Sequence, residues 1–187
     1  SKITKLVAST YQAVSGAGIE GQHELENQMV QIAEGKEVTH KVFRDQIACN
    51  VIAEIGSYND NGFTTEEMKM QNEGRKILHM PEMKVDCTCV RVPVMRSHSI
   101  SVQAVFEEKI SVEQATAAIA SFTGDVMCET ELPMPLYTSN QDLVYVGRIR
   151  PSLIEENGLV LWCCGDQVRK GAASNAVQII EYLEAHR

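Results

Sequence analysis

Residues 90–99 read Val-Arg-Val-Pro-Val-Met-Arg-Ser-His-Ser, and this stretch is the most informative in the chain. It sets Arg91, Arg96 and the imidazole of His98 in an otherwise apolar, strand-like run. Arginine can bind a carboxylate or phosphate through two parallel hydrogen bonds, and histidine can transfer a proton near neutral pH. The pattern predicts a site that holds a small anion beside a proton-transferring group. The alternative is a strand with solvent-facing charges and a histidine that bonds a backbone carbonyl.

The surrounding segments predict one α+β domain over residues 1–187, because strands and helices mix without strict alternation. Capping boxes at Thr64/Glu67 and Ser111/Gln114 mark two helix starts. The predicted strands are 3–8, 85–95, 100–107, 143–149 and 159–164, whereas 46–55 fits a strand or a buried loop. The predicted helices are the segment between Gly18 and Gly35, with an apolar stripe of Leu25, Met29, Ile32 and Ala33, and the segments 65–78, 112–122 and 171–186.

Composition excludes several classes of protein. The net charge is −8, and a nucleic-acid surface needs excess positive charge, so we expect no nucleic-acid partner. No apolar run approaches the roughly 20 residues of a membrane span, and no signal peptide is recognisable, so we expect no membrane association. Because the chain starts at Ser1 and leads almost directly into a strand, we expect it to be a piece of a longer or processed protein.

The six cysteines fall mostly in apolar runs, such as Cys87-Thr88-Cys89 and Cys163-Cys164. Neither run has the CxxC spacing of a zinc site, so no metal site is predicted. Free cysteine behaves as a small buried hydrophobic residue, which favours core packing in a reducing compartment such as the cytosol or an organelle stroma.

Three further clusters could carry chemistry. Gln12 precedes the turn 15–18, whose backbone N–H groups suit an anion or a carboxamide, although SGAG also serves as a plain turn. Glu73 and Lys76 share a helix face, where a solvated ion pair is the alternative to a substrate-binding pair. The loop after Gly165 leads from a buried strand into the last helix and carries Gln167. In an ideal strand the Arg91 and His98 side chains would point to opposite faces, so a bulge or strand end is needed for them to converge.

Taken in order, these clusters resemble the C-terminal part of aspartate-semialdehyde dehydrogenases, over almost the whole chain. The matching stretches are STYQAVSGAG (9–18), EEMKM (66–70), KIL (76–78), CVRVPV (89–94) with RSHS (96–99), YVGRIR (145–150), GDQ (165–167) and KGAA (170–173). The resemblance implies a mixed, largely antiparallel sheet with helices packed on one face, as in the C-terminal domain of glyceraldehyde-phosphate dehydrogenase. It also implies a cytoplasmic or plastid homodimer.

The family reduces β-aspartyl phosphate to aspartate semialdehyde with NADPH and releases phosphate, in lysine, threonine and methionine biosynthesis. The resemblance implies that His98 is the acid–base residue and that Gln12 orients the substrate or acyl intermediate. Burial beside cations should keep His98 neutral, so that it acts first as a base. By the same resemblance the substrate amine would bind Glu73, its carboxylate Arg91 and the departing phosphate Lys76. Residues near the nicotinamide end of NADP would be Ser15, Gly16 and Gln167.

Two family features have no counterpart here: the nucleophilic cysteine that precedes the STYQ segment, and the glycine-rich dinucleotide fingerprint. We therefore expect the Rossmann domain and the nucleophile to lie on a missing segment, and the chain alone to be inactive. The related N-acetyl-glutamyl-phosphate reductases share the chemistry, but Glu73, placed for a free ammonium, argues against an acetylated amine. The other hypothesis is a non-catalytic assembly module of the same fold.

Overall fold

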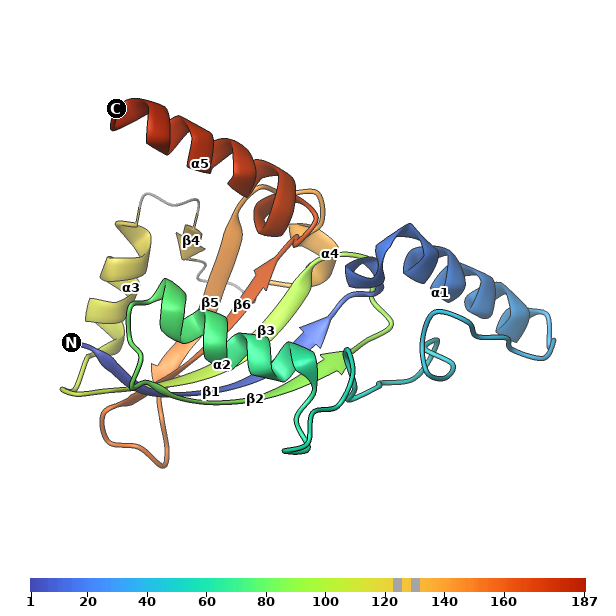
Figure 1. Cartoon of the computed structure of the whole chain (residues 1–187), viewed down its shortest axis with the longest axis horizontal. Helices are drawn as coiled ribbons and strands as arrows, with labels where there is room; N and C mark the ends of the chain where they lie inside the picture. The colour runs from blue at the N-terminus through green and yellow to red at the C-terminus, as the bar shows by residue number, and fades with distance from the viewer. Residues whose placement is uncertain (123–125, 129–131) are drawn as a thin grey trace.

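The computed structural model describes residues 1–122, 126–128 and 132–187, and its centre is a six-stranded mixed sheet in the order β2-β1-β3-β6-β5-β4 (Figure 1). β1 runs parallel to β2, β4 parallel to β5, and the β1–β3, β3–β6 and β5–β6 pairs are antiparallel. The predicted α+β fold is confirmed. The strands are β1 (Ile3–Gln12), β2 (Lys84–Arg91), β3 (His98–Phe106), β4 (Val126–Cys128), β5 (Val144–Pro151) and β6 (Gly158–Gly165).

One end of this sheet gathers the ends of four strands. Gln12 at the end of β1 pairs with Arg91 at the end of β2, and Tyr11 pairs with Ser99 near the start of β3. His98 pairs with Gly165, the last residue of β6. The predicted strand 85–95 is too long, because Pro93 has no N–H to donate to a strand ladder and the strand ends at Arg91.

The helices differ in how closely they pack on this sheet. α2 contacts β2, whereas α1 projects away from the sheet and α5 closes the chain (Figure 1). Among the described residues, no helix is long and apolar enough to cross a membrane. The helices are a 3-10 turn (Val14–Ala17), α1 (Gly18–Ala33), α2 (Thr65–Ile77), α3 (Val112–Ala120), α4 (Pro135–Thr138), a π-helical turn (Arg169–Ala173) and α5 (Ser174–Ala185).

α2 covers β2 and begins with the predicted capping box. Thr64 Oγ1 accepts a hydrogen bond from the Glu67 N–H, and the Glu67 carboxylate accepts one from the Thr64 N–H. The same carboxylate also accepts the N–H of Cys89 on β2 at 3.0 Å. Because only the short segment 78–83 joins α2 to β2, the helix runs back along the strand and its first turn lies near Arg91.

A second core lies beside α1. The α1 residues that face this core are more polar than the predicted apolar stripe. Leu25 is buried, but Met29 is 58% exposed, and the side chains that face the protein instead include Glu24 and Gln28. The Gln28 Oε1 accepts two backbone N–H groups, of Ile47 and Ala48, at 2.9 Å each. Residues 46–55 therefore form a loop rather than a strand, with Ile47 and Ala48 buried and residues 49–51 exposed. The Gln28 amide and the packing of Ile47 and Ala48 with Leu25 hold this loop to α1.

The cysteine prediction holds for some positions only. Cys87, Cys89 and Cys164 are buried free thiols, Cys163 is half-buried, and Cys49 is exposed, so core packing is wrong for Cys49. The Cys49 backbone has a φ of 60°, in a turn rather than in a strand. The side chain of Cys128 lies outside the described part of the chain.

The face of the sheet opposite α2 carries exposed apolar side chains. Along β1, Leu6 and Ala8 pack with β2 and Met70 of α2, whereas the alternate residues Val7 and Tyr11 are 40% and 38% exposed. The Tyr11 ring contacts the Trp162 ring of β6 with centroids 5.5 Å apart. Val7, Tyr11 and Trp162 thus form an apolar patch on the sheet face opposite α2, which we call the open face.

We expect Thr64→Ala to lower the free energy of unfolding by about 1–2 kcal/mol, since the variant loses a buried N-cap hydrogen bond. Urea unfolding followed by circular dichroism measures the change. Ser111→Ala removes the corresponding cap of α3 at an exposed position and serves as the matched control, with an expected loss of about 0.5–1 kcal/mol. Equal losses in both variants would contradict the stabilising role of the α2 cap at the β2 interface.

Candidate active site

Arg91 and His98 converge above Gly16, as the sequence-based hypothesis requires. A Cβ built on Gly16 would lie 2.6 Å from Arg91 Nη1 and 3.3 Å from His98 Nε2, so a larger residue would have to displace the Arg91 guanidinium. Convergence comes from strand ends rather than from a bulge, because Arg91 ends β2 and His98 begins β3. Between them Ser97 adopts a left-handed φ of 72°, which redirects the chain into β3.

The Arg91 guanidinium is held by backbone and by an aromatic ring. Its Nη1 donates to the Ala13 carbonyl oxygen at 2.6 Å, and its Cζ lies 5.9 Å from the centre of the Phe43 ring. Phe43 is placed in turn by Glu24, whose carboxylate accepts the N–H groups of residues 41–43 at 2.7, 2.7 and 3.2 Å. Burial lowers the pKa of Arg91, but arginine stays charged at neutral pH.

His98 is neutral at pH 7 in this environment. Burial and the nearby Arg91 charge lower the pKa of His98 to about 4, in agreement with the expected neutral form. Its Nδ1 accepts the N–H of Ala13 at 3.1 Å, so the hydrogen of the neutral ring sits on Nε2. The first proton step open to Nε2 is therefore donation. Acceptance there requires the other tautomer, which loses the Ala13 hydrogen bond at a cost of about 1 kcal/mol.

Gln12 joins this pair to α2 through Glu66. Thr10 Oγ1 donates to Gln12 Oε1 at 2.8 Å, which leaves the amide nitrogen to donate to Glu66 Oε1 at 3.3 Å. Lys69, one turn along α2, forms an ion pair with the other Glu66 oxygen at 3.1 Å. Burial opposes ionisation of Glu66, but hydrogen bonds from Lys69 and Gln12 outweigh it, and the pKa of Glu66 falls below its ordinary value.

The structure does not bring Glu73 and Lys76 to this cluster. They lie seven residues beyond Glu66 and Lys69 on the same face of α2, which places them about two turns or 10 Å along the helix axis. Both side chains are exposed. The sequence contains the same Glu–x–x–Lys spacing twice, and only the first copy lies in the helical turn that faces the ends of β1 and β2.

Helix direction is the signal that distinguishes the two copies. A helix joined to the next strand by a short segment runs antiparallel to that strand, so the N-terminal turn of the helix lies at the strand's C-terminal end. Arg91 occupies that end of β2, and the capping box at Thr64 marks the first turn. The pair in that turn, Glu66 and Lys69, was therefore identifiable in principle.

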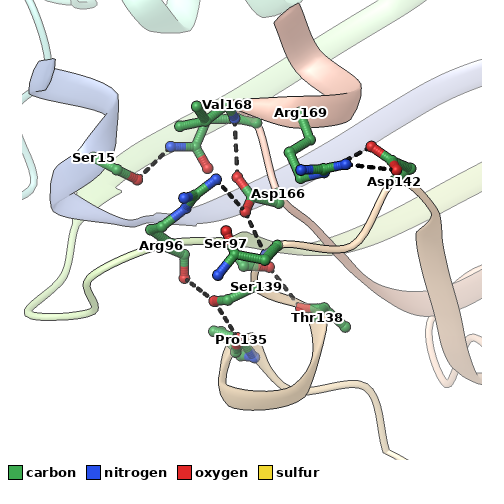
Figure 2. Close-up of polar contacts among 12 residues, drawn as sticks. Ser15, Arg96, Ser97, Pro135, Thr138, Ser139, Asp142, Asp166, Val168 and Arg169 are labelled. Atoms are coloured by element: carbon green, nitrogen blue, oxygen red, sulfur yellow. Dashed lines mark hydrogen bonds and ion pairs between the residues drawn. The ribbon is translucent and has the colours of Figure 1, made fainter. Parts of the chain in front are cut away.

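Ser15 and Gln167 meet next to Gly16, and Gln167 lines a pocket together with His98. The Gln167 amide nitrogen donates to Ser15 Oγ (Figure 2), whereas its Oε1 is buried and has no hydrogen-bond partner among the described residues. A buried acceptor without a partner is costly and calls for an external donor. The predicted grouping of Ser15, Gly16 and Gln167 at the site is thus present.

Asp166 is the fully buried anchor of this side of the site (Figure 2). Its carboxylate accepts the N–H groups of Asn140 and Val168 at 2.7 and 3.0 Å and forms an ion pair with Arg96 at 2.8 Å. Arg96, which the sequence grouped with the anion-binding residues, is thus engaged in a structural pair. A buried carboxylate needs such compensation, because the desolvation of an unpaired charge costs several kcal/mol.

The His98 environment predicts a stability change with pH. A histidine with a pKa of about 4 when folded and about 6.5 when unfolded stabilises the native state above pH 6.5 and progressively loses that contribution as the pH falls through 4. We expect His98→Gln to reduce the loss of unfolding free energy between pH 7 and pH 4 by about 3 kcal/mol. Urea unfolding at the two pH values measures it, with His40→Gln, at an exposed position, as the control. Identical pH dependence in the wild type and His98→Gln would refute the assignment.

The comparisons with known proteins identify the family of the chain. A family model described as "Semialdehyde dehydrogenase, dimerisation domain" matches residues 1–170. The aspartate-semialdehyde dehydrogenase of Aquifex aeolicus is 44% identical over 97% of this chain and 55% of its own length. That of Synechocystis is 43% identical over the same shares of both chains.

A solved structure is also similar to this chain. Aspartate semialdehyde dehydrogenase II from Vibrio cholerae, complexed with ASA, has a TM-score of 0.94 and 39% identity, over 98% of this chain and 55% of that chain. The chain spans about half the length of the relatives it matches. From the family model, the identities and the shared fold, the chain belongs to the semialdehyde dehydrogenase dimerisation-domain family.

Proposed function

We propose that this chain supplies the substrate-binding and acid–base part of an NADP-dependent aspartate-semialdehyde dehydrogenase. The reaction is the reductive dephosphorylation of L-4-aspartyl phosphate to L-aspartate 4-semialdehyde, with release of phosphate. One observation carries the proposal: strand ends bring an amide, a guanidinium and a neutral imidazole together, and the first turn of α2 adds the Glu66 carboxylate beside them. A purely structural module has no need of that constellation.

The charges of the cluster complement those of the proposed substrate. Aspartyl phosphate carries a carboxylate, an ammonium group and an acyl phosphate. Arg91 offers the planar fork that suits the carboxylate, and the ionised Glu66 suits the ammonium group. The Lys69 side chain is 60% exposed beside Glu66, so its ammonium group can contact the phosphate of the substrate. Glu66 and Lys69 therefore replace Glu73 and Lys76 as our candidates for the amine and phosphate contacts.

His98 and Gln12 would act on the reacting carbonyl. Gln12, fixed by Thr10, can donate its amide to an acyl oxygen if the substrate displaces Glu66 Oε1. His98 Nε2–H lies beside Gly16 and would give a proton to an oxygen that gains negative charge, then recover it at the same atom. The attacking cysteine would come from a segment outside this chain.

The residues present fit a nicotinamide at Ser15 and Gln167. A carboxamide group has both a donor and an acceptor. Gln167 Oε1, which has no hydrogen-bond partner in the described part of the chain, and the Ser15 hydroxyl match that need. When bound, NADPH supplies the hydride for the reduction. Gly16 contributes indirectly, because its missing side chain lets Arg91 and His98 approach.

A second copy of the chain would cover the open sheet face. The Val7, Tyr11 and Trp162 patch is apolar, and the matching family model is described as a dimerisation domain. Self-complementary association through a two-fold axis is the commonest arrangement of soluble oligomers. We therefore propose a homodimer whose interface includes this patch.

The test of function uses a protein that joins this chain to the nucleotide-binding part of a family member. We expect phosphate-dependent reduction of NADP by L-aspartate semialdehyde from the joined protein and none from the chain alone. Within it, Glu66→Gln should lower kcat/KM roughly 10- to 100-fold, because hydrogen bonds to charged groups contribute about 1.5–3 kcal/mol. Lys69→Ala should raise the KM for phosphate.

Matched controls come from the second Glu–x–x–Lys pair. Glu73→Gln and Lys76→Ala remove the same groups about two turns away and should change kcat/KM by less than about twofold. Loss of activity in these variants instead would return the amine and phosphate contacts to Glu73 and Lys76. An inactive but folded and assembled joined protein would favour the non-catalytic assembly module.

A separate variant tests the proposed dimer interface. Val7→Glu should weaken self-association at least about 100-fold, because the two-fold axis buries the unpaired charge twice and each costs several kcal/mol. Sedimentation velocity of the chain should then change from dimer to monomer. Ile77→Glu places the same charge at an exposed apolar position on α2 and should leave the dimer intact. A Val7→Glu variant that still dimerises would move the interface elsewhere.

A further inference from the structure

Two buried thiols that the proposed reaction does not use lie side by side under α2. Cys87 and Cys89 alternate along β2, so both side chains point to the same face of the sheet. Their sulfur atoms are 3.6 Å apart, and the side chains are 5% and 0% exposed. They pack with Ala8, Met70 and Ile100.

The two thiols are chemically unequal. The hydrogen bond from Cys87 lowers the pKa of Cys89, although burial and the charges of Glu66 and Glu67 oppose it. The same hydrogen bond, burial and the nearby acidic charges raise the pKa of Cys87, so Cys87 keeps its proton. Two thiols in contact can act as an attacking and a resolving cysteine once α2 opens from β2 far enough to admit an oxidant, since both side chains are buried.

We propose that Cys87 and Cys89 form an oxidisable pair, which hydrogen peroxide converts to a reversible intrastrand disulfide. Cys89 attacks peroxide, so that the O–O bond breaks, a sulfenic acid forms at Cys89 and one water leaves. The Cys87 sulfur then attacks the sulfenic sulfur, the S–O bond breaks, and a second water carries away the remaining thiol proton. Two thiols are oxidised, one peroxide is reduced, and a dithiol reductant reverses the change.

Closure requires β2 to contract locally, because a disulfide needs Cβ atoms about 3.5–4.5 Å apart and same-face residues of an extended strand lie farther apart than that. Residues two apart in a strand have Cα atoms about 6.6 Å apart, because each residue adds about 3.3 Å. Disulfides span Cα separations of about 4.4–6.8 Å, so this pair sits at the upper limit. β2 is an edge strand and can shorten locally, since along most of its length it pairs only with β1.

Closure would act on groups that belong to the candidate active site. The Cys89 N–H donates to Glu67, the residue that closes the capping box of α2, and Arg91 is only two residues further along β2. Contraction between Cys87 and Cys89 therefore strains the contact between the strand and the helical turn that carries Glu66. Oxidation would disturb both sides of the proposed substrate site without touching a substrate contact.

The other described cysteines lack this arrangement. Cys163 and Cys164 are consecutive in β6, so their side chains point to opposite faces of the sheet. Cys49 is exposed and lies in a turn of the α1-side loop. These three thiols serve as internal references for any oxidation experiment.

The test exposes the native chain to graded hydrogen peroxide, blocks the remaining thiols and digests with trypsin. Cleavage after Lys84 and Arg91 releases the peptide VDCTCVR, which holds both cysteines. We expect this peptide to lose two hydrogen masses while the Cys163-Cys164 peptide stays fully alkylated. Deuterium uptake across residues 84–91 should accelerate after oxidation, and dithiothreitol should reverse both changes.

Variants make the result decisive. Cys87→Ala should leave Cys89 as a sulfenic or higher acid without a disulfide, whereas Cys49→Ser should oxidise like the wild type. Thermal melts of each reduced variant establish that it is folded before oxidation. An alkylated VDCTCVR peptide at peroxide doses that already oxidise Cys49 would overturn the proposal, and so would equal oxidation of the Cys163-Cys164 peptide. Neither readout requires dehydrogenase activity, so the proposal stands or falls independently of the proposed function.

Discussion

The register between β1 and β2 is the constraint on which the rest of the structure depends. Gln12 faces Arg91 across a parallel pair, and this single alignment fixes where the amide, the guanidinium and the first turn of α2 meet. A slip of one residue would turn every side chain of β2 to the other face. Arg91 would then point to the open face of the sheet, and the two thiols would leave the core. The register is protected because Ala8, Cys87 and Cys89 are buried together.

Sequence reasoning found most elements and most of the site cluster, for identifiable reasons. The capping boxes at Thr64 and Ser111 are local signals and located two helices correctly. The pattern of residues 90–99 grouped Arg91 with His98, and the resemblance added Gln12. This grouping agrees with the geometry, although the proposed roles stay predictions. The convergence of Arg91 and His98 could not be derived from alternation alone, because it depends on where two different strands end.

The misses share one physical cause: they depend on what packs against a segment rather than on its own pattern. Glu73 and Glu66 have equivalent helical surroundings in sequence, and only the direction of α2 along β2 separates them. The stripe predicted for α1 failed because Glu24 and Gln28 occupy the inward positions, where they satisfy the backbone of an irregular loop. Hydrophobic periodicity cannot reveal such positions, since a buried polar side chain looks like a solvent-facing one.

Ala13 gives the site a property that side chains alone could not. Its N–H donates to His98 Nδ1 and its carbonyl oxygen accepts from Arg91 Nη1, so one residue of backbone holds both functional groups. One residue of backbone and two hydrogen bonds therefore help to set the separation between the Arg91 guanidinium and the His98 imidazole. Substitutions of nearby side chains can change the charge or shape around a substrate, but they leave the distance between the Arg91 and His98 groups largely unchanged. A homologue or a redesign that accepts a longer backbone between carboxylate and carbonyl would need an insertion or deletion in the chain here.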